Sequence, residues 1–526
     1  MKLKDLRMKN NEWKLVLLTW GILTLILLPW KNSLSQDDGT YAWQALQWSQ
    51  YSWSVHPANV AAVIPQTFLG AIAVSLFSFL KPIIVLNLLT WSLFLLILGL
   101  TATWTGSSLI FLISIFSYPL WIQYSASFLY EIYSSALILG LLLSIDQKES
   151  KFQWLFVSLF SFLIPLQVQT TSIIPVSLGL FYFIFLPIRR KLALSLILCP
   201  MIGLITYYLL PQSILQQTLL LTIGAREFQL KTFSFFFLQL LLGFGSLLLP
   251  FMRNFKNWSL RLWISSLFLF LTSYALLYFS DAPILSIGVL FTQYMPRSIA
   301  ILPIAIGAFG LVGCTPIMMR ALNDSIKRVD TLAFLVSMCG FFAFYSLKGI
   351  NDFRISMIFV IFFIFSIRPF LQLESKLGES KLFTASLLAL SLFVNSYNLD
   401  TTEARWKLAA SLEKEGKSPA EISAGYGRDV FNLEATCIDR AQQKLDSNSF
   451  SHFLFFNVPR CYNYEWTPKY LIKPHKIFGK TLSLQLNRQP GQDQAPQKIY
   501  PYRSLGLQHE LAVFENPHPT FSWCLR

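Results

Sequence analysis

Two adjacent acidic side chains, Asp37 and Asp38, closely follow a hydrophobic run that ends near Trp30. A third acid, Glu131, lies in the apolar sequence SASFLYEIYSSALILGLLLSI. Carboxylates are costly near a membrane, so residues of this kind are candidates for chemistry. A positioned carboxylate can take the proton of a hydroxyl group or hold a divalent cation. The sequence therefore predicts a site with acidic side chains, in which Asp38 could also cap a helix that begins near Thr40.

Basic side chains that could bind an anion are predicted on the same side of the membrane. His56 lies in WSVHPAN, and Arg226 and Lys231 lie in AREFQLK. Arg297 lies in QYMPRSIAILP. Each alone could be an interfacial anchor whose charged end reaches the headgroups. Together they could stabilise a departing phosphate while a carboxylate activates an acceptor hydroxyl, which favours sugar transfer from a polyprenyl-phosphate carrier.

The composition places these residues in a membrane protein. Hydrophobic residues make up 54% of the 526-residue chain and charged residues only 13%. This excludes a soluble globular enzyme and is typical of a chain that crosses the membrane many times. Most of the net charge of +15 lies in short clusters between apolar runs, which is the positive-inside pattern and not a basic groove for nucleic acid. We expect no nucleic-acid partner.

Fourteen apolar runs are long enough to cross a bilayer, and the charges between them indicate which do. The runs are residues 14–30, 59–80, 83–104, 106–122, 127–146, 153–168, 171–187, 192–210, 232–250, 262–279, 298–318, 331–347, 354–371 and 382–398. If 59–80 lies on the outer surface, the inner loops hold thirteen basic residues and the later outer loops six. Because insertion favours basic loops inside, we predict 13 spans with 59–80 uncrossed.

This topology divides the chain into two parts. Residues 1–398 form the predicted all-α transmembrane domain, in which 31–82 is the first outer loop with juxtamembrane helices. The N-terminus lies in the cytoplasm of a plasma (inner) membrane protein, and 399–526 form a small extracytoplasmic α/β domain. Cys437, Cys461 and Cys524 lie in this tail, and their spacing includes no CxxC pair that would indicate zinc.

The order of these motifs resembles the class C (GT-C) membrane glycosyltransferases. The similar branch contains the bacterial relatives of protein O-mannosyltransferase and the lipid A aminoarabinose transferase. Its D-[DE]-x-x-Y-x-x-x-A motif reads DDGTYAWQA here, which matches Asp37, Asp38, Tyr41 and Ala45. A downstream His-Pro element matches VHPAN, and a second acid that begins a later span matches Glu131, where the family usually has Asp.

The resemblance implies roles for these residues. Asp37 takes the position of the catalytic base in an inverting transfer, while Asp38, Tyr41 and Glu131 orient the acceptor or an ion. His56, Arg226, Lys231 and Arg297 bind the carrier phosphate, although the family's R-Y-x-x-P-x-x-P element is only approximated around Arg297. The family's 13-span layout agrees with the prediction from charge.

The resemblance also implies the partners. These are a polyprenyl-phosphate sugar donor, membrane lipids, and a lipid, protein or glycan acceptor. No cofactor is required, and Asp38 and Glu131 are the residues that could hold a divalent cation. Two alternatives stay open: a flippase or transporter of polyprenol-linked glycans, and a glycan ligase with a diphosphate donor. The clustering of the acids at one face of the membrane favours chemistry over transport.

Overall fold

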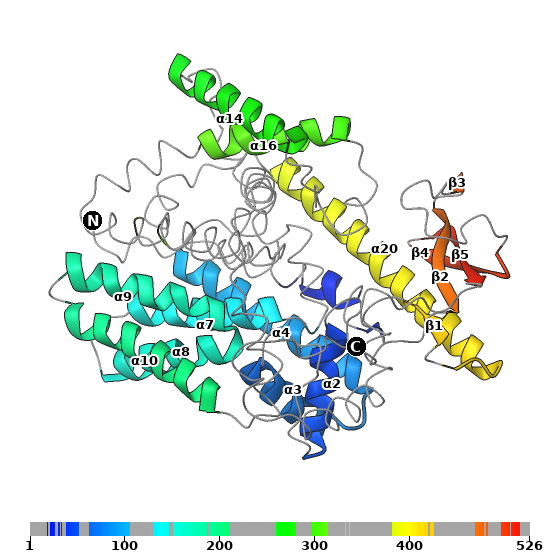
Figure 1. Ribbon diagram of the computed structural model, residues 1–526, viewed down its shortest axis with the longest axis horizontal. Helices are drawn as coiled ribbons and strands as arrows, with labels where there is room; N and C mark the ends of the chain where they lie inside the picture. Colours follow the sequence, from blue (N-terminus) through cyan, green and yellow to red (C-terminus); the bar gives the residue numbers. More distant parts are fainter. Residues whose placement is uncertain are drawn as a thin grey trace, which may run out of the picture.

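Helices make up the first part of the computed structural model and strands the last (Figure 1). The structure describes residues 18, 21–26, 30–31, 33, 38–51, 63–105, 128, 130–146, 151–186, 189–209, 259–279, 297–313, 332, 336, 381–418, 421–424, 469–477, 480–481, 496–504 and 506–515. The predicted spans 106–122, 232–250 and 354–371 lie outside these residues, as do the three cysteines of the tail.

Two helices occupy the predicted outer loop 31–82. Helix α2 spans Asp38–Ser49 and helix α3 spans Ile64–Leu76. With 13 residues, α3 is about 20 Å long, whereas the hydrocarbon core of a bilayer is about 30 Å thick. It is therefore shorter than the predicted run 59–80, and the position of this run along the membrane surface stays a prediction.

A bundle of apolar helices follows α3 in the chain. Its members are α4 (Pro82–Thr105), α7 (Tyr130–Asp146), α8 (Lys151–Gln167), α9 (Ile173–Phe185) and α10 (Arg190–Leu209). Each begins and ends within a few residues of a predicted run. By length and composition, two stretches in the described part of the chain could cross a membrane, Pro82–Thr101 and Arg190–Tyr207. The apolar helices at 64–76, 152–167, 173–185 and 260–276 are shorter than the 18 residues taken as the minimum for a span.

The two ends of this bundle differ in chemistry. At one end the Trp104 indole donates a hydrogen bond of 3.0 Å to Asp146 Oδ2, which joins the end of α4 to the end of α7. Because α8, α9 and α10 alternate in direction, the α9–α10 turn with Arg189, Arg190 and Lys191 lies at this end, which we call the basic end. The opposite end, which we call the α2 end, contacts α2 and α3.

Glycine allows close approach between the bundle helices. A Cβ atom on Gly203 of α10 would lie 2.5 Å from the carbonyl oxygen of Phe162 of α8. One on Gly179 of α9 would lie 2.9 Å from the carbonyl oxygen of Ala193 of α10. Small residues at helix contacts are typical of bundles in lipid, where apolar side chains gain nothing by leaving the surface.

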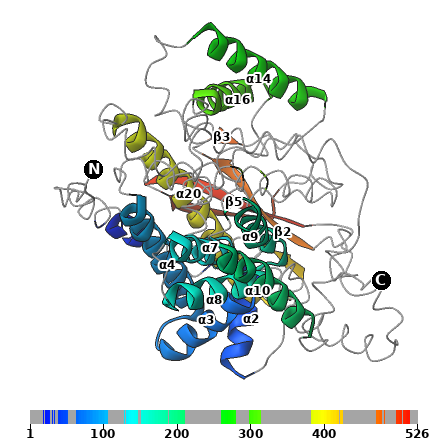
Figure 2. The ribbon, with the colours of Figure 1, turned by 90° about the vertical axis from the view of Figure 1, so that its left-hand side faces the viewer.

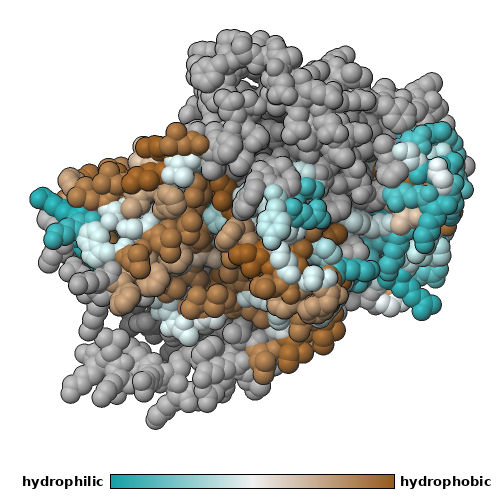
Figure 3. Space-filling view, turned by 90° about the horizontal axis from the view of Figure 1, so that it is seen from below, coloured by the Kyte–Doolittle hydropathy of each residue, from teal (hydrophilic) through white to brown (hydrophobic). Residues whose placement is uncertain are grey.

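The outer faces of the bundle helices are apolar, as Figure 3 shows for one side of the molecule, with polar surface gathered toward the C-terminal strands. Exposed large hydrophobic residues on α8, α9 and α10 include Phe152, Leu155, Leu180, Ile184, Leu198 and Ile202. A continuous apolar surface of this extent is typical of contact with lipid.

Two further helices, α14 (Leu260–Phe279) and α16 (Arg297–Gly313), pack together through the rings of Trp263 and Phe309, whose centroids are 5.7 Å apart. Figures 1 and 2 show this pair at the opposite edge of the molecule from α2 and α3. The two helices coincide closely with the predicted runs 262–279 and 298–318.

Helix α20 spans Lys381–Lys414 without interruption. The predicted domain boundary at 398/399 therefore falls inside one helix, because helical structure continues where the apolar run stops. The helix ends in a Schellman motif, in which Lys417 N donates to Leu412 O (3.1 Å) and Gly416 N to Glu413 O (2.9 Å). Gly416 has a φ of 87°, which a residue with a side chain rarely adopts.

The second half of α20 covers a sheet. The strands are β1 (Ile422–Ser423), β2 (Tyr470–Ile477), β3 (Lys480–Thr481), β4 (Lys498–Ser504) and β5 (Leu507–Glu515). Their order is β1-β2-β5-β4, with β3 beside β2; β1 and β2 are parallel and the other pairs antiparallel. Leu408 and Leu412 of α20 are buried against Ile422, Leu511 and Val513. We call α20 from residue 399 onward and this sheet the C-terminal unit.

Candidate active site

The motif helix α2 is held against the start of α7 and against α3. Tyr41 is 1% exposed, and its ring meets that of Tyr130 edge to face, with the centroids 5.9 Å apart. Ala45 is fully buried, and its Cβ would lie 3.0 Å from a Cβ atom placed on Gly70. The tyrosine and the alanine of the DDGTYAWQA motif therefore both have a packing role: one contacts α7 and the other allows α3 to approach.

Glu131 lies at the same place, directly after Tyr130 in the first turn of α7. Its side chain is fully buried. A helix N-terminus carries partial positive charge, which favours a carboxylate there. Two segments that the sequence singled out, α2 and the start of α7, thus meet at the α2 end of the bundle through the Tyr41–Tyr130 contact.

A network of buried amides fixes α3 beside these helices. Gln167 Nε2 at the end of α8 donates to Gln66 Oε1 (2.9 Å), and Gln167 Oε1 accepts from the Gln66 backbone N–H (3.1 Å). Gln66 Nε2 donates to the carbonyl oxygen of Phe128 (2.9 Å), just before α7. Gln44 of α2 donates to Thr67 Oγ1 (2.9 Å). Buried polar groups that are satisfied in this way fix one relative position of the helices.

Val63, the residue before α3, has an unusual backbone conformation. It is fully buried with φ 44° and ψ 42°, which is rare for a β-branched residue. Its carbonyl oxygen accepts the Thr67 N–H at 2.9 Å, so it begins the helix. Such strain persists only where the surrounding structure fixes it, and it is often found at functional sites.

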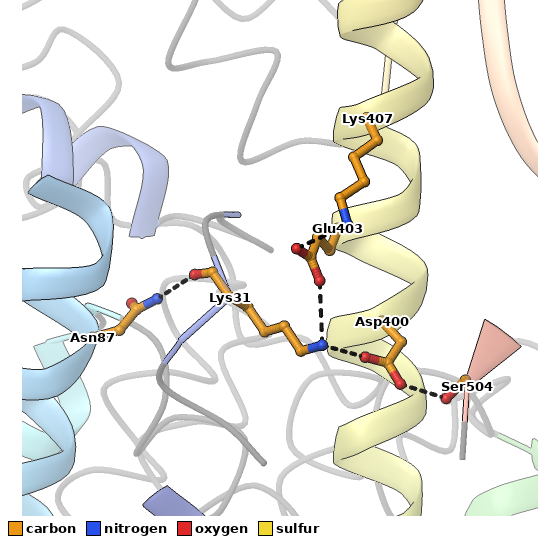
Figure 4. Close-up of polar contacts among 6 residues, drawn as sticks. All are labelled: Lys31, Asn87, Asp400, Glu403, Lys407 and Ser504. Carbon is orange, nitrogen blue, oxygen red and sulfur yellow. Dashed lines mark hydrogen bonds and ion pairs between the residues drawn. The ribbon is translucent and has the colours of Figure 1, made fainter. Parts of the chain in front are cut away.

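A cluster of charged residues joins the predicted outer loop 31–82 to the C-terminal unit (Figure 4). Lys31 Nζ lies 2.6 Å from Asp400 Oδ1 and 3.2 Å from Glu403 Oε2, both on α20. Ser504 of β4 donates to Asp400 Oδ2 at 2.7 Å. Asn87 Nδ2 of α4 donates to the backbone carbonyl oxygen of Lys31 at 3.1 Å. We call Lys31, Asn87, Asp400, Glu403 and Ser504 the clasp.

The charges of the clasp stabilise one another. Burial lowers the pKa of Lys31, but the hydrogen bonds and charges of Asp400 and Glu403 outweigh it and hold the pKa above its ordinary value. Burial raises the pKa of Glu403, but Lys31 and Lys407, which is 3.2 Å away, hold it below its ordinary value. Lys31 and Glu403 are therefore both charged around neutral pH.

An aromatic cluster adjoins the clasp. The His509 ring of β5 lies between Tyr397 and Tyr502, with centroid distances of 4.9 Å and 5.2 Å. The Tyr502 hydroxyl is hydrogen-bonded to Thr401 Oγ1 at 2.8 Å. Burial lowers the pKa of His509, so the neutral imidazole is favoured there.

The structure describes only part of the predicted site. Asp37, His56, Arg226 and Lys231 lie outside the described residues. Asp38 is the first residue of α2 and Arg297 the first of α16, and only their backbone is described. Helices α16 and α2 lie at opposite edges of the molecule, which does not favour a phosphate site shared by Arg297 and the acid pair (Figures 1 and 2). Because the side chains of both are outside the described residues, this shared site stays a prediction.

Metal binding by Asp38 and Glu131 also stays a prediction. Among the described residues, no group of three His, Cys, Asp or Glu side chains could hold a metal ion. The side chain of Asp38 is not among them, and Glu131 alone is one ligand.

Sequence reasoning missed the clasp and the amide network. Lys31 and Asp400 are separated by 369 positions, and Gln66 and Gln167 by 101. A signal was nevertheless present: Gln66 and Gln167 are amides in or beside apolar runs, where an unpaired polar group is costly. Such residues can be expected to pair, although the sequence does not say with what.

Comparisons with known proteins give distant similarity only. No known protein family and no curated protein matches the chain. Among solved structures, the chain is similar to ArnT from Cupriavidus metallidurans bound to undecaprenyl phosphate, with 11% identity, a TM-score of 0.40, and coverage of 78% of this chain and 81% of that one. The apo state of ArnT gives 10% identity and a TM-score of 0.39 over the same shares. Similarity at this level does not carry a functional argument, which has to come from the residues.

Proposed function

We propose that the chain is an inverting class C membrane glycosyltransferase. It would move a sugar from a polyprenyl-phosphate donor to a lipid, protein or glycan acceptor at the outer face of the plasma (inner) membrane. The observation that carries the proposal is the contact of Tyr41 with Tyr130. Through this contact, the helix that begins at the acid pair adjoins the turn of α7 that holds the buried Glu131.

The reaction assigns one step to each group. The carboxylate of Asp37 takes the proton of the acceptor hydroxyl, and the oxygen attacks the anomeric carbon from the side opposite the phosphate. The bond between that carbon and the phosphate oxygen breaks, and the polyprenyl phosphate leaves with its negative charge. His56, Arg226 and Lys231 stabilise this charge, with Arg297 as a further member. Asp38, Tyr41 and Glu131 orient the acceptor or an ion.

The clasp supports the proposed topology. Lys31 follows the predicted first span and Asp400 follows the predicted last one, and an ion pair of 2.6 Å requires both on the same side of the membrane. With the N-terminus in the cytoplasm, both lie outside. In a background from which the six native cysteines have been removed, single cysteines at Lys81 and Lys414 should therefore react with an impermeant thiol reagent added to intact cells. Protection of either one would contradict the topology.

The test of the activity is transfer from a synthetic polyprenyl-phosphate sugar by purified protein. Asp37→Asn keeps the shape and removes the base, so turnover should fall by a factor of about 10²–10⁴. Asp38→Asn should cost less, and Glu131→Gln should fall between the two. If Asp38→Asn is inactive while Asp37→Asn works normally, the roles of the two acids are reversed.

The same assay separates the alternatives. Transfer only from a diphosphate-linked donor would indicate a glycan ligase instead. Movement of the donor between leaflets without bond cleavage would indicate a flippase. Normal transfer by both Asp37→Asn and Asp38→Asn would refute the mechanism.

A further inference from the structure

We propose that Lys31 is a positioning residue, which holds the chain leading into the acid pair against the C-terminal unit. This inference rests on the proposed function, because it concerns the same acid pair. It adds the C-terminal unit to the site: α20 and β4 would take part in catalysis through the clasp, without touching the substrate.

Lys31 is fixed at both its backbone and its side chain. Asn87 of α4 donates to its carbonyl oxygen at 3.1 Å, and its ammonium reaches Asp400 and Glu403 of α20 at 2.6 Å and 3.2 Å. Figure 4 shows the side chain extended between the two helices. One residue thus ties the first outer loop to the bundle on one side and to the C-terminal unit on the other.

The acid pair lies a short distance along the chain from this anchor. Asp37 lies six positions after Lys31, and even a fully extended chain spans only about 20 Å over that length. The next residue, Asp38, begins α2, which is itself fixed by Tyr41 against Tyr130 and by Ala45 against Gly70. The acid pair therefore lies between two anchored parts of the chain, Lys31 before it and α2 after it, and release of Lys31 would remove the first of them.

The clasp is better suited to positioning than to holding the C-terminal unit together. The side chains of Lys31, Asp400 and Glu403 are 26%, 16% and 24% exposed, and ion pairs that water still reaches contribute less to stability than their number suggests. The apolar contacts of Leu408 and Leu412 already join α20 to the sheet. Loss of the clasp should thus leave a folded protein with a displaced acid pair.

A matched control exists in the same unit. Lys498 of β4 forms an ion pair with Glu415 near the end of α20. This pair also joins α20 to the sheet, but it does not include the first outer loop. Glu415→Gln therefore removes one ion pair of the C-terminal unit without releasing Lys31.

The experiment measures sugar transfer by full-length Lys31→Met, Asp400→Asn, the double variant, Lys31→Arg and Glu415→Gln. Active protein is counted by the stoichiometry of tight binding of a fluorescent polyprenyl phosphate. We expect Lys31→Met to bind at full stoichiometry with an unchanged donor KM, and its kcat to fall by about 10- to 100-fold, as misplaced groups do. Lys31→Arg should recover most of this loss, and Glu415→Gln should stay within about twofold of the parent.

The double variant tests whether the two residues act together. If they do, Lys31→Met with Asp400→Asn should be no slower than the worse single variant. Unchanged kcat in both single variants would overturn the inference. A loss of transfer activity that is fully explained by an equal loss of protein able to bind the polyprenyl phosphate would overturn it as well. An inactive parent protein would instead refute the proposed function, and the positioning role with it. If Lys31→Met cannot be purified, Asp400→Asn combined with Glu403→Gln removes both carboxylates that pair with Lys31, and the same outcomes apply to this variant.

Discussion

In the bundle, α8 and α10 meet where Gly203 faces the Phe162 carbonyl, whereas in the C-terminal unit α20 meets its sheet through Leu408 and Leu412. The first contact depends on the absence of side chains and the second on large ones. This difference follows from the surroundings. Lipid gives apolar side chains no reason to leave the surface, so bundle helices gain stability by close approach. Water favours burial of leucine, so α20 contributes a conventional apolar core.

If large buried side chains hold the C-terminal unit together, the largest loss of stability should come from a substitution in its core. Leu408 is fully buried, and Leu408→Ala should lower the free energy of unfolding by about 2–5 kcal/mol. Thermal unfolding of the purified full chain in detergent provides the measurement. Lys414→Ala, at an exposed position of the same helix, is the control and should have little effect. Equal effects of the two would mean that α20 is not anchored by its apolar face.

The bundle should lose stability when a side chain is enlarged at a helix contact, whereas the C-terminal unit should lose it when a side chain is made smaller. Gly203→Ala places a methyl group against the Phe162 carbonyl, which cannot move without its helix, and should cost about 1–3 kcal/mol. Gly140→Ala is the matched variant, because its new methyl group meets the Phe160 ring, which can rotate away. Unfolding in mixed micelles should show Gly203→Ala as the less stable of the two. If Gly140→Ala were the less stable variant, the contact between Gly203 and the Phe162 carbonyl would not be the tight one.

A smaller effect is expected inside the C-terminal unit, where α20 contacts β4. Tyr502→Phe removes the hydroxyl that is bonded to Thr401 and should cost about 1 kcal/mol. Thr401→Val should cost a similar amount, and the double variant no more than the larger single loss. Additive losses would show that the two hydroxyl groups do not depend on each other.

The smallest effects should come from pH, and they should be confined to the C-terminal unit. The pKa of His509 is lowered from 6.5 by burial, so its contribution to stability is present above pH 6.5 and is lost as the pH falls through the folded-state pKa. The pKa of Glu403 is lowered from 4.5, so its contribution is lost in a second step below that value. Tyr397, Tyr502 and the charge of Asp400 face His509.

These steps can be separated by two variants. Melting temperatures recorded from pH 8 to 3 should lose the upper step in His509→Gln and the lower one in Glu403→Gln. A parent protein whose melting temperature is constant over this range would contradict both assignments.

Apolar runs predicted the bundle helices well because charged residues mark several of their ends, such as Asp146 at the end of 127–146 and Lys191 before 192–210. The run 127–146 became α7 at Tyr130–Asp146, and 192–210 became α10 at Arg190–Leu209. The same signal failed at α20, where the apolar run ends near residue 398 but the helix continues to Lys414. The spacing of Ala404, Leu408 and Leu412 is that of one helix face, which could have revealed the continuation.

The candidate site was predictable in its members but not in its contacts. The sequence singled out Tyr41 and Glu131 by motif and by position, and the structure joins their segments through Tyr130. Nothing in the local pattern around Lys31 indicates Asp400, because an ion pair between distant residues leaves no periodicity in either segment. Pairings of this kind are decided by the tertiary fold, and only coordinates reveal them.

The continuity of α20 has a mechanical consequence. A single helix of 34 residues is a rigid rod about 51 Å long, with no hinge between its apolar first half and its water-facing second half. If its first half crosses the bilayer, any tilt of the membrane-embedded part swings the sheet through the same angle. The sheet would then stand at a fixed height above the lipid headgroups, and this height would limit how far from the membrane an acceptor could be reached.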